Sequence, residues 1–242
     1  MVYAAGGGNR MIAVTRSDDY PPQVNALARL DAVPLNFESI AALQPDLVLM
    51  DAEVNRVEDA DRLVALGIPA VMYETTSLNG VAEDLEAIGG VLGTTRQADL
   101  AAASFRFDVD SLRSLTAYVE RPSVLFLIGY NTLYAYGRDS YVHDLIDAAG
   151  GTSLTSELQE DPVLNEEFVV ASNPDVIIVA STEALSAANL TQAHPGFASL
   201  NAVTSNRVAA VDPDLVLRPG PRLVQGAFAI AKILHPQLFS DE

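Results

Sequence analysis

The sequence of 242 residues contains no cysteine, no tryptophan and a single lysine, Lys232. The absence of cysteine excludes disulfide bonds, thiolate zinc sites, cysteine-ligated iron–sulfur clusters and a cysteine nucleophile. Basic residues are also scarce, because 14 Lys and Arg stand against 32 Asp and Glu and leave a formal net charge of −18. That charge repels phosphate backbones and anionic headgroups, so we expect no nucleic-acid partner and no adsorption to a membrane surface.

Long apolar segments are missing as well. No stretch approaches the ~18 to 20 unbroken apolar residues that a membrane-spanning helix needs. The N-terminus has no basic region followed by an apolar stretch, which a signal peptide would show. We therefore expect no direct membrane insertion, and we expect any export signal or lipid anchor to lie outside this sequence.

The chain does contain short apolar runs separated by stretches with helical spacing. Such continuous apolar strands are typical of parallel sheets covered by helices, so they predict an α/β fold. The segment Arg96–Glu120 has neither Pro nor Gly and predicts one long helix, with Asp108-Val109-Asp110 as the place where it would break. We predict two α/β lobes, residues 1–95 and 121–242, joined by a linker helix over 96–120. The predicted strands are 11–14, 47–50, 70–73, 124–128, 176–180 and 208–211.

The two halves of the chain repeat one pattern. Asn36-Phe37-Glu38 is followed by Pro45-Asp46 and an apolar run, and Asn165-Glu166-Glu167 is followed by Pro174-Asp175 and another, at a constant offset of 129 residues. Each copy predicts an Asn cap, a Glu in the first helical turn and a buried strand. A second match, of residues 1–7 with 145–151, has an offset of 144 residues. We interpret the lobes as copies of one unit.

The duplication also predicts that something is missing from the first lobe. The second lobe opens with the strand 124–128, and subtracting the offset places its counterpart about 20 residues before Met1. We therefore expect the first lobe to lack its opening strand and to have one parallel strand fewer than the second. The neighbours of that strand would keep unpaired N–H and C=O groups.

The sequence offers no catalytic constellation. It lacks a Gly-x-Ser-x-Gly nucleophile elbow, and its histidines, His143, His194 and His235, do not have the spacing of a zinc site. Gly6-Gly7-Gly8 fails the dinucleotide-binding pattern and predicts a helix-ending turn with a left-handed glycine. We predict no catalytic residues, no bound metal and no cofactor, and a protein that is not an enzyme. His194, in a loop before Pro195, is kept as a weak candidate ligand.

Aromatic and polar residues gather where predicted strands end. The loop after 124–128 holds Tyr130, Tyr134, Tyr136 and Arg138, three of the eight tyrosines with an arginine. Ligands of two-lobed α/β proteins bind outside the carboxyl ends of the strands. Tyrosines offer flat contact area and arginine suits an anionic group, although core packing is the alternative for each ring. The predicted ligand-binding residues are Tyr20, Asp51, Tyr130, Tyr134, Tyr136, Asp214 and Arg218, with Arg138 at the rim.

Several segments together resemble a known family. They are 19–22 (Asp-Tyr-Pro-Pro), 38–49, 66–69 (Leu-Gly-Ile-Pro) and 218–224. In this order they resemble the substrate-binding proteins of ABC importers for vitamin B12, siderophores and haem, over nearly the whole chain. The resemblance implies two Rossmann-like lobes with parallel sheets, bridged by one long helix, as in class III periplasmic binding proteins. It also implies a periplasmic or otherwise extracytoplasmic monomer that binds a small-molecule metal chelate between its lobes.

The resemblance implies a second partner, the permease subunits of an ABC importer. In the family a glutamate of each lobe docks onto arginines of the permease, and the matching positions here are Glu38 and Glu167. The internal repeat singles out the same two residues. Both also fit the simpler interpretation of acids that stabilise a helix N-terminus.

The nature of the chelate carries over less well. An iron-siderophore or another metal chelate is favoured, with a cobalamin-type corrinoid close behind. An enzyme or metallochaperone on a similar scaffold, or a ligand-sensing receptor domain, are the alternatives, because fold does not determine function. The tryptophans of vitamin B12 binders are replaced by Ala32, Asp51, Asp161 and Leu215, and the haem-ligating tyrosine would fall near Asp31.

Overall fold

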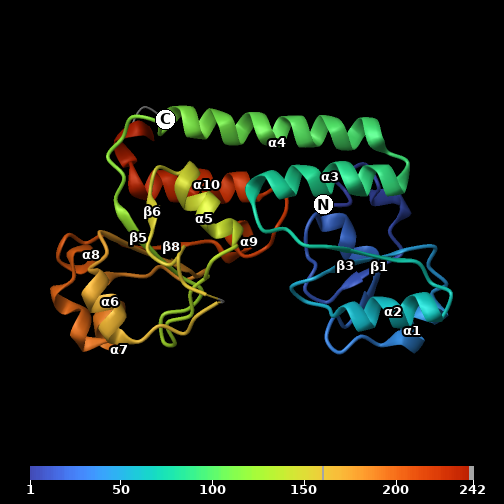
Figure 1. The fold of residues 1–242 in the computed structure, drawn as a ribbon, viewed down its shortest axis with the longest axis horizontal. Coiled ribbons are helices and arrows are strands. Elements are labelled where there is room, and N and C mark those ends of the chain that lie inside the picture. Colours follow the sequence, from blue (N-terminus) through green and yellow to red (C-terminus); the bar gives the residue numbers. More distant parts are fainter. Residues whose placement is uncertain (160, 240–242) are drawn as a thin grey trace. The chain divides into compact units, whose positions relative to one another are not determined.

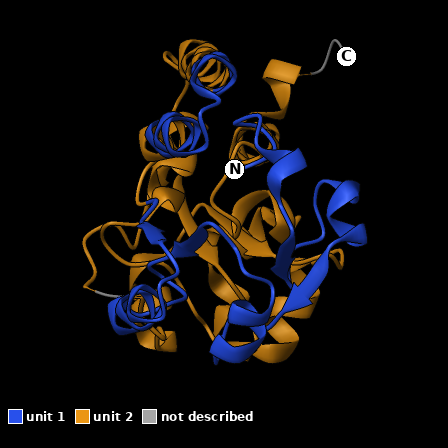
Figure 2. Cartoon of the chain, turned by 90° about the vertical axis from the view of Figure 1, so that its right-hand side faces the viewer, with its two compact units in different colours: residues 1–75, 83–101 blue, residues 76–82, 102–242 orange. Residues whose placement is uncertain are grey.

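The computed structural model describes residues 1–159 and 161–239 and has an α/β fold (Figure 1). Every pair of strands in the described chain is parallel, which confirms the predicted fold class. The chain divides into two compact units (Figure 2). Unit 1 comprises residues 1–75 and 83–101, and unit 2 comprises 76–82 and 102–242. Helices α3 (Leu78–Leu92) and α4 (Thr95–Leu115) each contribute residues to both units.

Unit 1 is built around two pairs of strands. Helices α1 and α2 pack on β3 and β4 through Ile40, Met50, Leu63 and Ile68, all of them buried. Burying these side chains contributes roughly 1.5–3 kcal/mol each. Gly6 has φ +85°, which confirms the predicted left-handed glycine. The elements are η1 (Gly8–Arg10), β1 (Ala13–Thr15), η2 (Pro22–Ala26), β2 (Ala28–Leu30), α1 (Phe37–Ala42), β3 (Val48–Asp51), α2 (Val57–Ala65) and β4 (Ala70–Tyr73).

Unit 2 contains one sheet of four strands in the order β6-β5-β7-β8. Its elements are β5 (Ser123–Leu127), α5 (Tyr141–Ala148), β6 (Thr152–Ser153), α6 (Glu166–Ser172), β7 (Val176–Ala180), α7 (Ala187–Ala193), η3 (Pro195–Ser199), α8 (Asn201–Thr204), β8 (Val208–Val211), α9 (Pro213–Val216), α10 (Leu223–Leu234) and η4 (Pro236–Phe239).

Helices cover both faces of the unit 2 sheet, which explains why its strands are apolar throughout. Leu125, Leu127, Ile177 and Val179 belong to a buried cluster with residues of α6, α7, η3 and α8. The intervening residues of the strands point to the opposite face, because side chains alternate along a strand. Helices α5 and α10 lie on that face (Figure 1).

The two units differ in how their strands join. The repeat aligns β3 with β7, and β1 follows Gly6-Gly7 as β6 follows Gly150-Gly151. In unit 2, β5 lies between β6 and β7, whereas in the described part of unit 1 no strand joins β1 to β3. This is the gap that the duplication predicts. The expected difference in strand number is not seen, because the unpredicted strand β2 pairs with β1 and brings the described strands of unit 1 to four.

Several details of the predicted elements need correction. The long helix ends at Leu115 instead of Glu120, since the chain turns at Thr116 towards β5 and the Thr116 hydroxyl donates to the Ala148 carbonyl at 2.9 Å. The helix does not break at Asp108-Val109-Asp110, because Val109 is one of the buried residues on its apolar side. The predicted strand 11–14 is found at 13–15, and β2 and β6 were not predicted.

Candidate functional site

A hollow of about 370 Å³ opens at the carboxyl ends of β5 and β7 in unit 2. This is the edge of a parallel sheet where ligand sites of α/β proteins form. Two of the predicted ligand-binding tyrosines, Tyr130 and Tyr134, line it. The remaining lining residues are Ile128, Gly129, Asn131, Thr132, Val179, Ala180 and Ser181.

The loop after β5 folds back on itself and presents Tyr134 outward. The amide of Ile128 donates to the Tyr134 carbonyl at 2.9 Å. Leu133 and Ala135 are 3% and 0% exposed, so the alternation of side chains along the backbone turns Tyr134 to the surface, where it is 48% exposed. The ring of Tyr130 is partly buried and packs against the cluster that includes Leu127 and Val179.

Tyr136 has a different environment from the other two tyrosines of the loop. Its ring centroid lies 6.5 Å from that of Phe126 and 6.0 Å from that of Tyr141, and both of those residues are buried. The structure thus places this ring beside the core, as the alternative interpretation allows. Arg138 is exposed and pairs with Glu157 at 3.4 Å.

The two predicted residues near the C-terminal end of unit 2 contact each other. Arg218 Nε lies 3.0 Å from Asp214 Oδ1, and both side chains are about one-third exposed or more, at 41% and 36%. Asp212 positions the aspartate, because its side chain caps α9 and accepts a hydrogen bond from the Asp214 amide. The pair therefore offers one cation and one anion just after β8, with the charge of each largely compensated.

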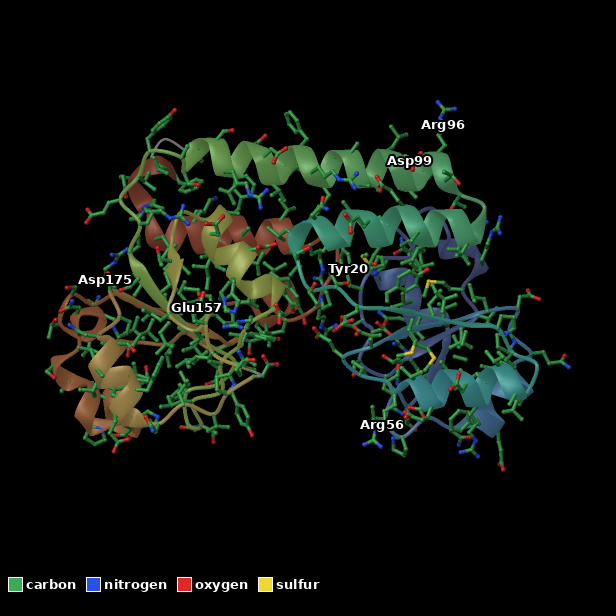
Figure 3. All side chains as sticks on the ribbon, viewed as in Figure 1. Tyr20, Arg56, Arg96, Asp99, Glu157 and Asp175 are labelled. Carbon is green, nitrogen blue, oxygen red and sulfur yellow. The ribbon has the colours of Figure 1, made fainter. Side chains whose placement is uncertain are left out.

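The two predicted residues of unit 1 lie at or after the ends of different strands, β1 and β3. Tyr20 is 56% exposed in the segment between β1 and η2 (Figure 3). Asp51 ends β3, where its carboxylate accepts a hydrogen bond from the Glu53 amide at 2.9 Å, and it aligns with Tyr73 at the end of β4.

Near the same edge of unit 1 the structure places three residues that sequence analysis missed, Tyr73, Thr75 and Asp84. The Thr75 hydroxyl donates to Asp84 at 2.5 Å, and burial raises the pKa of the Asp84 carboxyl, helped by the nearby charges of Glu83 and Asp51. Burial also raises the pKa of Tyr73, whose hydroxyl has no hydrogen-bond partner among the described residues. In the sequence, Tyr73 could have been noticed because it ends a predicted strand. Asp84 gave no such signal, because it lies within a helix.

The two predicted docking glutamates occupy equivalent places in the two units. Glu38 is the second residue of α1 and Glu167 is the second residue of α6, and both are exposed. The preceding Asn36 and Asn165 cap these helices, with side chains that accept hydrogen bonds from Ser39 and Phe168 amides at 2.9 and 2.8 Å. The exposure and the capping pattern confirm the local structure that the repeat predicts.

A larger groove, of about 840 Å³, lies at the opposite edge of the unit 2 sheet. It is lined by residues that precede the strands, including Pro122, Asp175 (labelled in Figure 3) and Arg207. Its guanidinium groups are engaged by main-chain carbonyls, such as that of Leu234 with Arg207 at 2.9 Å. Since ligands of parallel sheets bind at the carboxyl ends of strands, we favour the smaller hollow as the ligand site.

Neither a metal-binding cluster nor a membrane-spanning helix is found among the described residues. Within residues 1–159 and 161–239, no group of three or more His, Asp or Glu side chains is placed to hold a metal ion. In the same part of the chain, no helix is both long and apolar enough to cross a membrane.

Comparison with known proteins identifies relatives over the whole chain. The family model of the periplasmic binding proteins matches residues 2–215. An ABC transporter substrate-binding lipoprotein of Bacillus subtilis, YvrC, is 27% identical over 100% of this chain and 78% of its own length. A vitamin B12-binding protein of Yersinia pestis is 29% identical over 76% of this chain and 66% of its own length.

Solved structures show the same fold. The periplasmic vitamin B12-binding protein BtuF of Vibrio cholerae has a TM-score of 0.85 and 25% identity, covering 99% of this chain and 93% of that one. The periplasmic haem-binding protein RhuT of Roseiflexus also has a TM-score of 0.85, with 26% identity over 98% of this chain and 94% of that one.

Proposed function

This chain belongs to the periplasmic binding protein family, and on that basis we propose that it captures a metal chelate outside the cytoplasm and delivers it to the permease of an ABC importer. The favoured cargoes are an iron-siderophore and a cobalamin-type corrinoid. The observation that carries the proposal is the hollow at the carboxyl ends of β5 and β7, which is lined by Tyr130 and Tyr134. The relatives that bind vitamin B12 and haem support a large, flat, metal-containing cargo.

The chemistry of the hollow suits such a cargo. A chelate brings its own metal, so the protein needs contact area and hydrogen bonds instead of a full set of metal ligands. Tyrosine rings supply contact area with a polar tip at a low cost in side-chain entropy. The amides and hydroxyls of Asn131, Thr132 and Ser181, on the same hollow, can hydrogen-bond to peripheral oxygen atoms of the cargo.

The test of cargo binding is a thermal-shift and calorimetric comparison of cyanocobalamin, a ferric hydroxamate siderophore and haem. A ligand at 100 times its dissociation constant should stabilise the protein by about 2.7 kcal/mol. Tyr134→Ala should weaken binding about tenfold or more, because it truncates an aromatic anchor. Tyr118→Ala is the matched control, since Tyr118 is 99% exposed after the end of α4. If none of the three ligands binds, the proposed cargo class is wrong.

We propose further that Glu38 and Glu167 dock onto basic residues of the permease. Both carboxylates are exposed at the start of short capped helices, where they are accessible to a partner. Exposed ion pairs contribute roughly 0.2–1 kcal/mol each, so a single reversal should weaken association only modestly and the double reversal more.

The docking test compares Glu38→Lys, Glu167→Lys and the double variant in permease binding at low salt. Glu58→Lys is the matched control, because Glu58 is also an exposed second residue of a helix, α2, and the same change of charge is made there. Chelate affinity should stay constant in all four variants. Equal loss of permease binding in the Glu58 control and the double variant would show a general charge effect and would remove the docking role.

A further inference from the structure

His194 pairs with a carboxylate and stacks on a phenylalanine ring, and neither the cargo site nor the docking glutamates account for these contacts. It lies between α7 and η3 with 8% of its surface exposed. Its Nδ1 is 2.8 Å from Glu166 Oε1 and its Nε2 is 2.6 Å from the Tyr130 carbonyl oxygen. The ring also stacks on Phe197, with 4.9 Å between centroids and 23° between planes.

These partners determine where the protons are. A carbonyl oxygen only accepts hydrogen bonds, and an ionised carboxylate only accepts as well. Both ring nitrogens must therefore donate, unless Glu166 carries the proton. The Glu166 side chain is 50% exposed, so water can solvate its carboxylate. The hydrogen bonds are those of an imidazolium that pairs with a carboxylate.

The other two histidines do not have this arrangement. His143 Nδ1 lies 2.9 Å from the Ser153 hydroxyl, which can donate, so a neutral ring with its proton on Nε2 satisfies both His143 contacts. His235 Nε2 lies 3.1 Å from the Gly150 carbonyl, and a neutral ring satisfies that contact too. His143 and His235 can therefore serve as controls for the protonation of the His194 ring.

The two partners of His194 belong to the two functional regions of unit 2. Tyr130 is in the loop that lines the hollow, and Glu166 directly precedes Glu167 in the first turn of α6. Of the described side chains recorded in contact with the His194 ring, Phe197 of η3 is apolar and Glu166 is the titratable one. Space around the pair is limited, because a methyl group on Gly196 would lie 3.3 Å from Glu166 Oε2.

We propose that His194 is a positioning residue that ties the cargo loop to the first turn of the docking helix α6, and that it does so as an imidazolium. Nε2 holds the loop at the Tyr130 carbonyl, and Nδ1 holds the helix at the Glu166 carboxylate. The roles of Tyr130 and Glu167 rest on the proposed function, whereas the tie between the two segments does not.

The first test is ¹⁵N NMR of the ring nitrogens in the unmodified protein at pH 7, where three histidines give a simple spectrum. Both nitrogens of His194 should be protonated, and His143 should show the neutral form with its proton on Nε2. In Glu166→Gln the amide can donate to Nδ1 of a neutral ring, so His194 should lose its second proton. Glu167→Gln is the matched control and should leave the two-proton form in place. A neutral His194 in the unmodified protein would overturn the imidazolium assignment.

The second test is amide hydrogen exchange in variants. His194→Phe keeps an aromatic ring against Phe197 but removes both donors, so the amides of Ile128 in the loop and Val169 in α6 should both exchange about tenfold faster or more, the effect of one lost hydrogen bond on each segment. Glu166→Gln should retain protection in both segments, as a rescue by the conservative variant.

Two controls keep this test decisive. His143→Phe should accelerate exchange near Gly137, which accepts from His143, and leave α6 unchanged. Should His194→Phe fail to fold, His194→Gln can donate to only one of the two partners and should release one segment alone. Unchanged exchange in both segments would overturn the tie. Neither test uses chelate or permease, so failure of the proposed function leaves these results standing, and the reverse also holds.

Discussion

Replacement of Gly226 by alanine tests how closely α10 approaches α9. Gly226 is buried within α10, and a methyl group built on it would overlap the carbonyl oxygen of Leu215 and lie 2.9 Å from Val216 Cγ1. The obstacle is mainly backbone, so it cannot rotate away and one of the two helices has to move. Because Asp214 lies in α9 and Arg218 follows it, the close approach also positions two predicted cargo residues.

Two opposing effects determine how much the free energy of unfolding changes in Gly226→Ala. Overpacking of a well-packed site costs about 1–3 kcal/mol. Alanine in a helix interior is favoured over glycine by about 0.5–1 kcal/mol, which offsets part of that loss. The net destabilisation should be about 0–2.5 kcal/mol, and each kcal/mol lowers the melting temperature of a chain of this length by about 2–4 °C.

Gly90→Ala is the matched control for this change. Gly90 lies in α3, and a methyl group built there meets nothing within 4 Å, so the same substitution should stabilise the protein by about 0.5–1 kcal/mol. Urea unfolding followed by far-UV circular dichroism measures both variants, because the chain lacks tryptophan for fluorescence. If Gly226→Ala stabilises the protein as much as Gly90→Ala does, the methyl group meets no obstacle and the close approach of α10 to α9 is refuted.

Three further predictions concern single side chains. Asp175→Ala removes the acceptor for the Ser123 hydroxyl and amide, at 2.7 and 2.9 Å, and should cost about 2 kcal/mol at pH 7 in urea unfolding. Those bonds hold the pKa of the Asp175 carboxyl below its usual range. The carboxylate therefore stabilises the fold fully above the unfolded pKa near 4, and the stability difference between variant and parent should disappear as the pH falls through the lower folded pKa. Burial raises the pKa of the Asp84 carboxyl, so the stability of the parent should fall as the pH rises from the unfolded pKa to the folded pKa. A pH series of melting curves should show that Asp84→Asn loses this dependence and is at least as stable as the parent at pH 7. Asn165→Ala removes the cap from the Phe168 amide and should destabilise the protein by about 1 kcal/mol in chemical denaturation, whereas an unchanged midpoint would contradict the cap.

The sequence by itself determined the features that depend on neighbouring residues. Strands buried on both faces must be apolar throughout, so β4, β7 and β8 were predicted at their observed bounds. The cap and first-turn glutamate of α1 and α6 were also predictable, because a cap and its amide lie within one helical turn. The gap between β1 and β3 followed from the repeat, since duplicated segments fold alike.

Only the tertiary structure decided the features that depend on residues far apart in the chain. Tyr134 and Tyr136 lie two residues apart and look equivalent in the sequence, yet one is turned to the surface beside the hollow and the other packs against Phe126 and Tyr141. From the sequence His194 was only a weak candidate ligand in a loop, and its contacts could not be predicted because the partners lie 28 and 64 residues away. The role of each of these side chains depends on the donors, acceptors and rings that the fold brings into contact with it. Those partners are far away in the chain, so the local sequence does not show which they are.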